Sequence, residues 1–267
     1  MIKVGFVGLG NQGGPIAQRI IDQGFPVTLF ARRAPTLDPF RDSPAVVAAS
    51  LSELGARSDV VCVCVVDDAQ VEQVIAGDGL LAGMAPGSVA VILSAVDPEI
   101  CRRMDSLASK GGVSVVDAAV SGGGAVAARG ELTVMAGGDP GAYQRCLPVL
   151  QAFGANIQHL GGVGSGAAGK LINNFLFTGN LVLADLALKL GAQAGLERER
   201  LVSLLSTGSG RSFALSAVDS LLGPDVSGRP HGVRLISKDI ELVQRMAERL
   251  EHPLEEFAWL LRRLAGR

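Results

Sequence analysis

The chain has 267 residues, of which 48% are hydrophobic, and a formal net charge of −2 at pH 7. This length suffices for two compact domains with apolar cores. The near-neutral charge gives no reason to expect a nucleic acid or an acidic membrane as a partner. Glycine is the unusual residue, because its 35 occurrences gather in short clusters between apolar runs. Such clusters favour tight turns and close approach of the backbone to a ligand.

The N-terminus and the cysteines indicate a cytoplasmic protein. A strand-like segment begins at Ile2, where a secretory signal would show a basic region and then an apolar run. We find no uninterrupted apolar stretch near the ~18 residues of a membrane span. The four cysteines form no Cys-x-x-Cys pair, and the three histidines lack metal-ligand spacing. We therefore expect reduced thiols, no metal and no membrane partner.

The first half of the chain alternates short apolar runs with helical patterns, which is typical of a parallel sheet covered by helices. The run 60–66 consists largely of valine and cysteine, as in a strand buried on both faces. Asp67 and Asp68 follow it and are suited to cap a helix. We predict strands at Ile2–Val7, Val27–Phe30, Val60–Val66, Val89–Leu93, Val113–Asp117, Leu132–Ala136 and Ile157–Leu160, and helices at Pro15–Gln23 and Ala69–Ile75.

After Gly161 the pattern becomes helical throughout. The segment Ala167–Ala194 contains no proline and is long enough for about seven helical turns at 1.5 Å per residue. We therefore predict an α/β Rossmann-type domain over residues 1–162 and an all-α domain over residues 163–267. Further helices are predicted at Arg198–Leu205, Ala214–Leu222, Lys238–Leu250 and Leu254–Leu264.

The first glycine cluster lies between the first predicted strand and the first predicted helix. In that context Gly-x-Gly-x-x-Gly binds a dinucleotide: glycine allows the tight turn, the close approach of the pyrophosphate and the packing of helix on strand. The free N–H groups and the positive dipole end of the helix then hold the phosphates. The predicted cofactor-binding residues are Gly8, Leu9, Gly10, Asn11, Gln12 and Gly13.

The end of the second predicted strand favours NADP over NAD. An NAD site would carry Asp or Glu there to hold the ribose 2′-hydroxyl. This sequence has Arg32 and Arg33, and its next acidic residue is Asp38. Two guanidinium groups suit a 2′-phosphate, and the carboxylate that would repel it is missing.

A second glycine cluster, from Gly164 to Lys170, matches the Gly-x-x-x-x-Gly-Lys of a phosphate-binding loop. The following residue is Leu171, which has no hydroxyl for magnesium, so we disfavour a nucleoside triphosphatase. Lys170 and Asn174 lie four residues apart on the predicted helix and therefore share a face. A lysine can serve as a general acid or base when burial lowers its pKa.

Four motifs occur in the order typical of one enzyme family. They are Gly8–Gly13, Asp117–Gly123 together with Gly130–Thr133, Gly164–Asn174, and Ser237-Lys238-Asp239. Over nearly its whole length the chain thus resembles the β-hydroxyacid dehydrogenase family, which includes 3-hydroxyisobutyrate dehydrogenase and tartronate semialdehyde reductase. The resemblance implies a hydride transfer between a small 3-hydroxy acid and NADP.

The resemblance also implies a role for individual residues. Lys170 would be the catalytic acid and base, with Asn174 as its partner on the substrate. A cradle for the substrate carboxylate would be formed by Ser121, Gly122 and Gly123. From the helical domain, Lys238 would approach the cofactor or the substrate.

Two loops near the expected nicotinamide depart from the family pattern. Family members commonly have Leu-Pro after the fourth strand, where this chain has Val65 and Val66. They commonly have Ser-Thr after the next strand, where this chain has Ser94 and Ala95. We still assign Val66 and Ser94 to cofactor binding, with one hydroxyl fewer than usual beside the nicotinamide.

Other functions stay open at this point. A 6-phosphogluconate-type decarboxylating dehydrogenase has histidine where this chain has Asn173, and it is much longer. An imine reductase shares the architecture and the basic NADP turn but usually lacks a lysine at position 170. A non-catalytic NADP-binding protein would not need Lys170 or the cradle at residues 121–123. An NADP-dependent dehydrogenase therefore explains the motifs best.

The long predicted helix also suggests an assembly. Its apolar side chains include Phe175, Phe177, Leu181, Leu183 and Leu186. They cover more of the helix surface than one small domain should bury. We expect a homodimer or homotetramer in which the helical domains are in contact.

Overall fold

The computed structural model describes residues 1–77, 79–222, 229–252 and 254, with the backbone alone for 229–235. The chain divides into two compact units, Met1–Lys170 (unit 1) and residues from Leu171 onward (unit 2). The long helix α8 (Ser165–Gln193) begins in unit 1 and continues into unit 2. The predicted domain border at residue 162 lies just before this helix.

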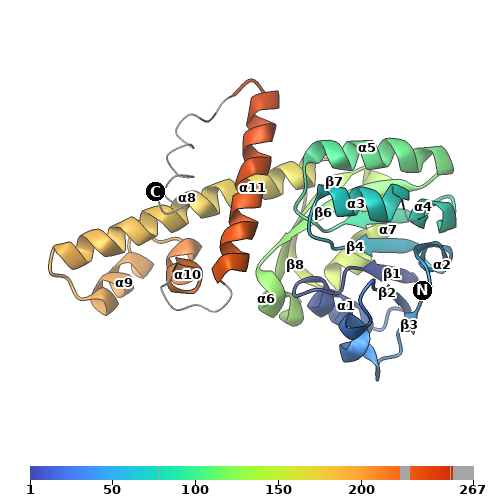
Figure 1. Cartoon of the computed structure of the whole chain (residues 1–267), viewed down its shortest axis with the longest axis horizontal. Helices are drawn as coiled ribbons and strands as arrows, with labels where there is room; N and C mark the ends of the chain where they lie inside the picture. Colours follow the sequence, from blue (N-terminus) through green and yellow to red (C-terminus); the bar gives the residue numbers. More distant parts are fainter. Residues whose placement is uncertain (78, 223–228, 253, 255–267) are drawn as a thin grey trace. The chain divides into compact units, whose positions relative to one another are not determined.

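Unit 1 contains an eight-stranded sheet in the order β3-β2-β1-β4-β5-β6-β7-β8 (Figure 1). All neighbouring strands are parallel except β6 and β7, which the sequence pattern did not reveal. The strand order reverses between β1 and β4, the position at which doubly wound sheets bind their ligands. The strands are β1 (Val4–Val7), β2 (Val27–Phe30), β3 (Val46–Val47), β4 (Val60–Val63), β5 (Val89–Ile92), β6 (Ser114–Ser121), β7 (Leu132–Gly138) and β8 (Gly154–His159).

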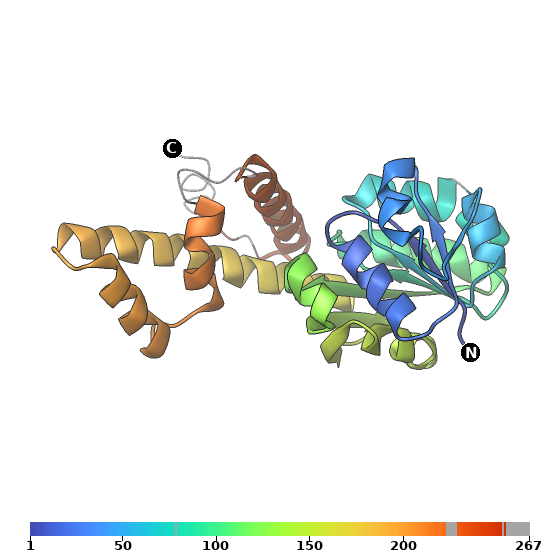
Figure 2. The same cartoon turned by 90° about the horizontal axis from the view of Figure 1, so that it is seen from below.

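Each face of the sheet has its own apolar core, because successive side chains of a strand point to opposite faces. Phe6 and Cys62 belong to the core on one face, whereas Val7 and Val61 belong to the core on the other. The first core includes residues of α1 (Gly13–Asp22), α6 (Gly123–Arg129) and α7 (Pro140–Gln151) (Figure 2). The second includes residues of α2 (Leu51–Ala56), α3 (Asp68–Glu72), η2 (Gln73–Gly77), α4 (Leu80–Gly83) and α5 (Pro98–Ala108). Short 3-10 helices complete unit 1 at η1 (Ala34–Phe40) and η3 (Ser109–Gly111).

Aspartate side chains cap the N-termini of several of these helices. The Gln70 N–H donates to Asp67 Oδ1 at 2.9 Å, as predicted for the helix after β4. Helices α5 and α7 were not predicted, although each follows the same local signal. Asp97 and Asp139 cap them, and a proline occupies the first turn of each.

In the described part of unit 2 every regular element is a helix. The later part of α8 packs on α11 through Leu171 and Val182, and on α10 through Leu181 and Leu188. The remaining helices are α9 (Arg198–Thr207), α10 (Phe213–Leu222) and α11 (Arg229–Arg249). The helix predicted over Leu254–Leu264 lies outside the described residues after Leu254.

Helix α8 leaves much of its apolar surface exposed. Ile172, Leu176, Leu183 and Leu190 are each more than half exposed. By length and composition alone α8 could cross a membrane, although the core helix of a soluble protein meets the same criterion. Of the five side chains on which the assembly was predicted, only Leu183 is exposed; the other four pack in the cores of unit 2, namely Phe175, Phe177, Leu181 and Leu186. The remaining apolar face of α8 is formed by other residues.

Candidate active site

The predicted cofactor residues of unit 1 lie at one edge of the sheet. They follow β1, β2, β4 and β5, which are parallel and therefore end at the same edge. The loops after β4 and β5 are also bonded to each other, because the Val65 N–H donates to Ser94 Oγ at 2.9 Å. Ser94 is buried, whereas Val66 is exposed.

Each glycine of the first cluster is required for a different steric reason. A Cβ on Gly8, whose φ is +96°, would lie 2.0 Å from the Cys64 carbonyl oxygen. A Cβ on Gly13 would lie 1.9 Å from the Gly8 carbonyl oxygen. A Cβ on Gly10 would meet no atom within 4 Å. Gly8 and Gly13 thus allow the chain to pack on itself, and Gly10 leaves the open space that a pyrophosphate requires.

The start of α1 is left open for an anion. The Gln12 side chain makes no capping hydrogen bond within the described part of the chain, and the first helical turn has no acidic residue. Gly10 and Asn11 are exposed, whereas the Leu9 side chain is buried in the core, so that Leu9 can serve a ligand only through its backbone. Free N–H groups and the helix dipole make this end a phosphate-binding site.

The basic turn after β2 is available for an anion as well. Arg32 and Arg33 are exposed, and neither guanidinium makes an ion pair or hydrogen bond to a residue that the structure describes. The nearest acidic residue in sequence, Asp38, pairs with Arg41 at 2.8 Å. The carboxylate that could have neutralised the two arginines is therefore engaged elsewhere.

The predicted substrate cradle lies beside the cofactor loop in unit 1. Residues 121–123 join β6 to α6, and Gly122 and Gly123 have φ values of +135° and +78°. A Cβ on the next residue, Gly124, would lie 2.4 Å from the Asn11 carbonyl oxygen. The backbone of the cradle thus approaches the fingerprint loop as closely as glycine permits.

Asp117, in the middle of β6, caps the start of α8. The Gly164 N–H donates to its Oδ1 and the Ala167 N–H to its Oδ2, each at 2.7 Å. Asp117 is only 1% exposed. Burial raises its pKa above the ordinary value, although these backbone hydrogen bonds act in the opposite direction. The sequence interpretation did not include Asp117 among the site residues; its one signal was an acid inside an apolar strand.

The glycines of the second cluster allow the start of α8 to pack closely against its neighbours. A Cβ on Gly166 would lie 2.3 Å from the Met135 carbonyl oxygen, and one on Gly169 would lie 2.4 Å from a methyl group of Leu160. The N–H groups that a phosphate would need are bonded to Asp117. The segment is therefore the close-packed start of a helix, in agreement with our rejection of a triphosphate loop.

Lys170 lies on the second turn of α8, half-buried, as the last residue of unit 1. Asn174 follows one turn later on the same helix, within unit 2. Residues spaced by four on a helix share a face. The predicted helical pairing of these two residues thus holds in the structure.

Unit 2 joins Asn174 to the C-terminal Lys-Asp motif. The Asn174 side-chain amide donates to Asp239 Oδ2 at 2.6 Å, and it accepts a bond of 3.1 Å from Asn173. Lys238 Nζ lies 3.7 Å from Asp239 Oδ1. Asp239 therefore connects two residues predicted to contact ligands, although the sequence analysis gave Asp239 itself no role.

The cysteines near this edge are unreactive thiols. All four are free, and Cys62, Cys101 and Cys146 are buried. Cys64 follows β4, and burial of its thiol raises the pKa to about 12. At neutral pH the nucleophilic thiolate form is therefore scarce.

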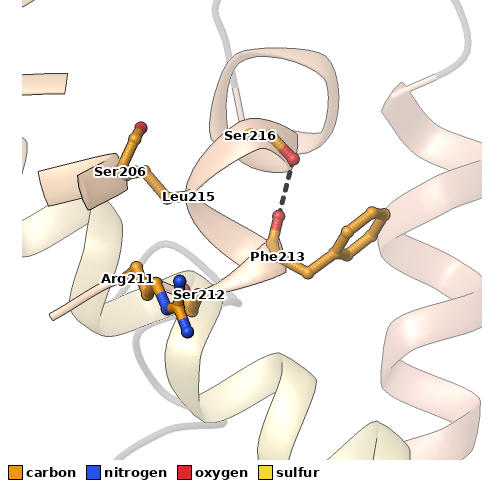
Figure 3. A pocket seen from close by; sticks show the side chains of 6 residues that line it. All are labelled: Ser206, Arg211, Ser212, Phe213, Leu215 and Ser216. Carbon is orange, nitrogen blue, oxygen red and sulfur yellow. Dashed lines mark hydrogen bonds between the residues drawn. The ribbon is translucent and has the colours of Figure 1, made fainter. Parts of the chain in front are cut away.

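A separate hollow of about 360 Å³ lies in unit 2, between the end of α9 and the start of α10 (Figure 3). Ser216 donates to the Phe213 carbonyl at 2.7 Å, and Ser206 to Val202 at 2.7 Å, so both hydroxyl protons are already used. Among the described residues that line the hollow, Arg211 is the one charged side chain. None of these lining residues is a predicted site residue, and none is an Asp, Glu, His or Lys that could act as an acid–base group.

Comparisons with known proteins agree with these features. The sequence profile of the NAD-binding domain of 6-phosphogluconate dehydrogenase matches residues 3–161, and that of the NAD-binding domain of NADP-dependent 3-hydroxyisobutyrate dehydrogenase matches residues 164–262. 2-(Hydroxymethyl)glutarate dehydrogenase of Eubacterium barkeri is 34% identical over 81% of this chain and 72% of its own length. The chain belongs to the β-hydroxyacid dehydrogenase family. It is therefore a dehydrogenase with a nicotinamide dinucleotide-binding domain.

Two further relatives extend the comparison within this family. The NAD-dependent L-serine dehydrogenase of Pseudomonas aeruginosa is 32% identical over 93% of this chain and 86% of its own length. The structure of Mycobacterium tuberculosis 3-hydroxyisobutyrate dehydrogenase with L-serine has a TM-score of 0.86, with 26% identity over 100% of this chain and 93% of that one. The structural match confirms the predicted fold, a Rossmann-type domain followed by helices.

Proposed function

We propose that the protein is an NADP-dependent oxidoreductase that interconverts a small 3-hydroxy acid and the corresponding semialdehyde or oxo acid. The observation that carries the proposal is the position of Lys170 at the start of α8. Unit 1 fixes this helix start through Asp117 and also contains the open fingerprint loop and the cradle at residues 121–123. Groups for the cofactor, the substrate carboxylate and the proton are thus all present in unit 1.

The residues present fit a bound dinucleotide. The space at Gly10 and the uncapped N-terminus of α1 would take the pyrophosphate. Arg32 and Arg33 would hold a 2′-phosphate, which supports NADP, although one relative is named as NAD-dependent. When bound, the nicotinamide accepts or supplies the hydride.

The protein must then move the proton that remains. In the oxidation direction Lys170, in its neutral form, accepts the hydroxyl proton while the carbon loses its hydride. In the reduction direction the ammonium form returns that proton to the oxygen. Backbone N–H groups of residues 121–123 bind the substrate carboxylate, and Asn174 orients the substrate without titrating. Lys238, held by Asp239, supplies positive charge to the cofactor or substrate.

The names of the relatives support the substrate class. L-serine, 3-hydroxyisobutyrate and 2-(hydroxymethyl)glutarate each carry a hydroxyl on the carbon β to a carboxylate. A carboxylate cradle and one acid–base group next to a nicotinamide site satisfy this shared chemistry. We assign the protein to this class of small acids.

The exposed apolar face of α8 supports an assembly of two or more copies, which we place in the cytoplasm as a proposal from the sequence alone. Leu176, Leu183 and Leu190 are 62%, 57% and 67% exposed, and a second copy would bury them. We expect light scattering at micromolar concentration to give the mass of a dimer or larger. A monomeric mass would contradict this assembly.

Lys170→Ala tests the proposed reaction. General acid–base catalysis contributes about 100- to 10,000-fold, so we expect kcat to fall by that factor. NADPH affinity should stay nearly unchanged, because Lys170 is not among the residues assigned to the phosphates. Lys170→Arg should lower kcat by nearly the same factor, since a guanidinium cannot release its proton. The assay uses NADP⁺ and NAD⁺ with a panel of small 3-hydroxy acids.

Lys189→Ala is the matched control on the same helix. Lys189 forms an exposed salt bridge with Asp185 at 2.7 Å, and such pairs contribute little to stability. This variant should keep the wild-type kcat. If Lys170→Ala keeps more than about a tenth of wild-type kcat, the acid–base role of Lys170 is wrong.

A further inference from the structure

Asp117 is the last residue of β6 that pairs with β5, and it also pairs with β7 on the other side. The pairing of β6 with β5 is parallel up to Asp117, opposite Ile92, and its pairing with β7 is antiparallel from Val116 to Ser121. The strand then continues to Ser121, the first residue of the substrate cradle. Asp117 and Ser121 thus belong to one hydrogen-bonded strand, four residues apart, and the rest of the cradle follows directly.

The same side chain also fixes the start of α8. Its two oxygens accept from Gly164 and Ala167, each at 2.7 Å, and so span the first turn of the helix. Lys170 follows Ala167 by three residues, less than one further turn. A Cβ on Gly166 would collide with the Asp117 carbonyl oxygen at 2.7 Å, so backbone and carboxylate both meet this turn.

Keeping this carboxylate buried is costly for the fold. Desolvation outweighs the hydrogen bonds and raises the pKa of Asp117. An ionised group in that position therefore lowers stability at neutral pH relative to a neutral one. An asparagine would avoid that cost, but it has one acceptor oxygen and so could satisfy only one of the two N–H donors at the start of α8.

We propose that Asp117 is a positioning residue for the reaction: it sets the distance between Lys170 and the cradle at residues 121–123. The inference rests on the proposed role of Lys170. A carboxylate with two short bonds to one helical turn fixes both the height and the rotation of that turn against β6. Because proton transfer requires close approach of the reacting atoms, an error of about 1 Å can cost about 100-fold in rate.

Asp117→Asn is the first test. Asparagine retains one acceptor oxygen but presents an NH₂ group to the other N–H donor, so one of the two bonds is lost. We expect kcat per NADPH-binding site to fall about 10- to 100-fold. The Kd of NADPH and the KM of the hydroxy acid should change less than about threefold, because the groups that hold each ligand are intact. A cofactor deuterated at the transferred position should show a larger isotope effect, since chemistry becomes slower.

Asp139→Asn is the matched control. Asp139 caps α7 in the same unit by accepting the Ala142 N–H at 2.9 Å, and its side chain contacts neither the start of α8 nor Lys170 in any hydrogen bond given for the described residues. The Asp139→Asn variant should lose some thermal stability and keep the wild-type kcat per NADPH-binding site. A purely structural role of Asp117 would give the same pattern for Asp117→Asn, and that result would overturn the proposal.

Asp117→Glu covers the case in which Asp117→Asn does not bind NADPH. Glutamate keeps the charge and both oxygens but is longer by one methylene group, which displaces the start of α8. A loss of kcat of at least about tenfold with NADPH binding retained supports the proposal, and wild-type kcat refutes it. Lys170→Ala, measured in parallel, separates the two hypotheses. If Lys170→Ala is active, the proposed function fails; if it is inactive while both Asp117 variants are active, only the positioning role fails.

Discussion

The glycine-rich starts of α1 and α8 look alike in sequence and differ in what their N–H groups bind. At α1 the Gln12 side chain makes no capping bond among the described residues, and the space at Gly10 is open. At α8 the carboxylate of Asp117 takes the N–H groups of Gly164 and Ala167. The first start is thus ready for a phosphate, whereas the second already holds an anion that belongs to the protein.

The comparison shows why glycine content alone cannot identify a phosphate site. A helix N-terminus attracts any anion, and a buried carboxylate of the same chain has the advantage of being tethered. At α1 the glycines bring a ligand close to the backbone. At α8 they bring the helix close to the carbonyl groups of β6 and β7. The chemistry of a helix start is therefore decided by the nearest acceptor.

Gly166→Ala should give the largest effect and tests the packing role of the second cluster. The new Cβ would lie 2.3 Å from the Met135 carbonyl and 2.7 Å from the Asp117 carbonyl, both backbone atoms that cannot rotate away. Such overpacking in a well-packed region costs up to about 3 kcal/mol. We expect urea denaturation to show a fall of this size in the free energy of unfolding.

Gly10→Ala is the matched variant at the first cluster. Its Cβ meets no atom within 4 Å, so the free energy of unfolding should change by less than about 1 kcal/mol. The methyl group would instead fill the space of the pyrophosphate, and the Kd of NADPH should rise at least about tenfold. If Gly10→Ala loses stability and Gly166→Ala does not, the contrast between the two helix starts is wrong.

Local patterns sufficed for most of the fold. Solid apolar runs gave the buried strands, and the strand–glycine–helix context gave the cofactor loop. Helices α5 and α7 were missed although Asp97-Pro98 and Asp139-Pro140 mark their starts, so those signals were present and unused. The reversal of β7 has no such local mark, because β7 is buried on both faces and its apolar run resembles that of a parallel strand.

The missed site residues were hidden for a different reason. Asp117 finds its partners 47 and 50 residues later, and Asn174 bonds to Asp239 at a separation of 65 residues. Periodicity reports neighbours on one strand or helix, not contacts between distant segments. The family resemblance gave Lys170, Asn174 and Lys238 their roles, while the bonds that hold their helix start and side chains became visible only in the folded chain.

Arg32→Asp should give a smaller effect and extends the comparison to an anion site built from side chains. Arg32 and Arg33 are exposed on the turn after β2, whereas the pyrophosphate site uses backbone N–H groups after β1. Removing one charge-assisted contact to a 2′-phosphate costs about 2 kcal/mol, which is about 30-fold in kcat/KM for NADP⁺. The kcat/KM for NAD⁺ should stay the same or rise, because an aspartate there can accept a hydrogen bond from the ribose 2′-hydroxyl.

Arg57→Asp is the control, because it makes the same charge change at an exposed residue that pairs with Glu53. It should leave the ratio of kcat/KM for NADP⁺ to kcat/KM for NAD⁺ unaltered. Equal kcat/KM for the two cofactors in the unmodified enzyme, or an equal loss for both in Arg32→Asp, would show that these arginines do not read the 2′-phosphate.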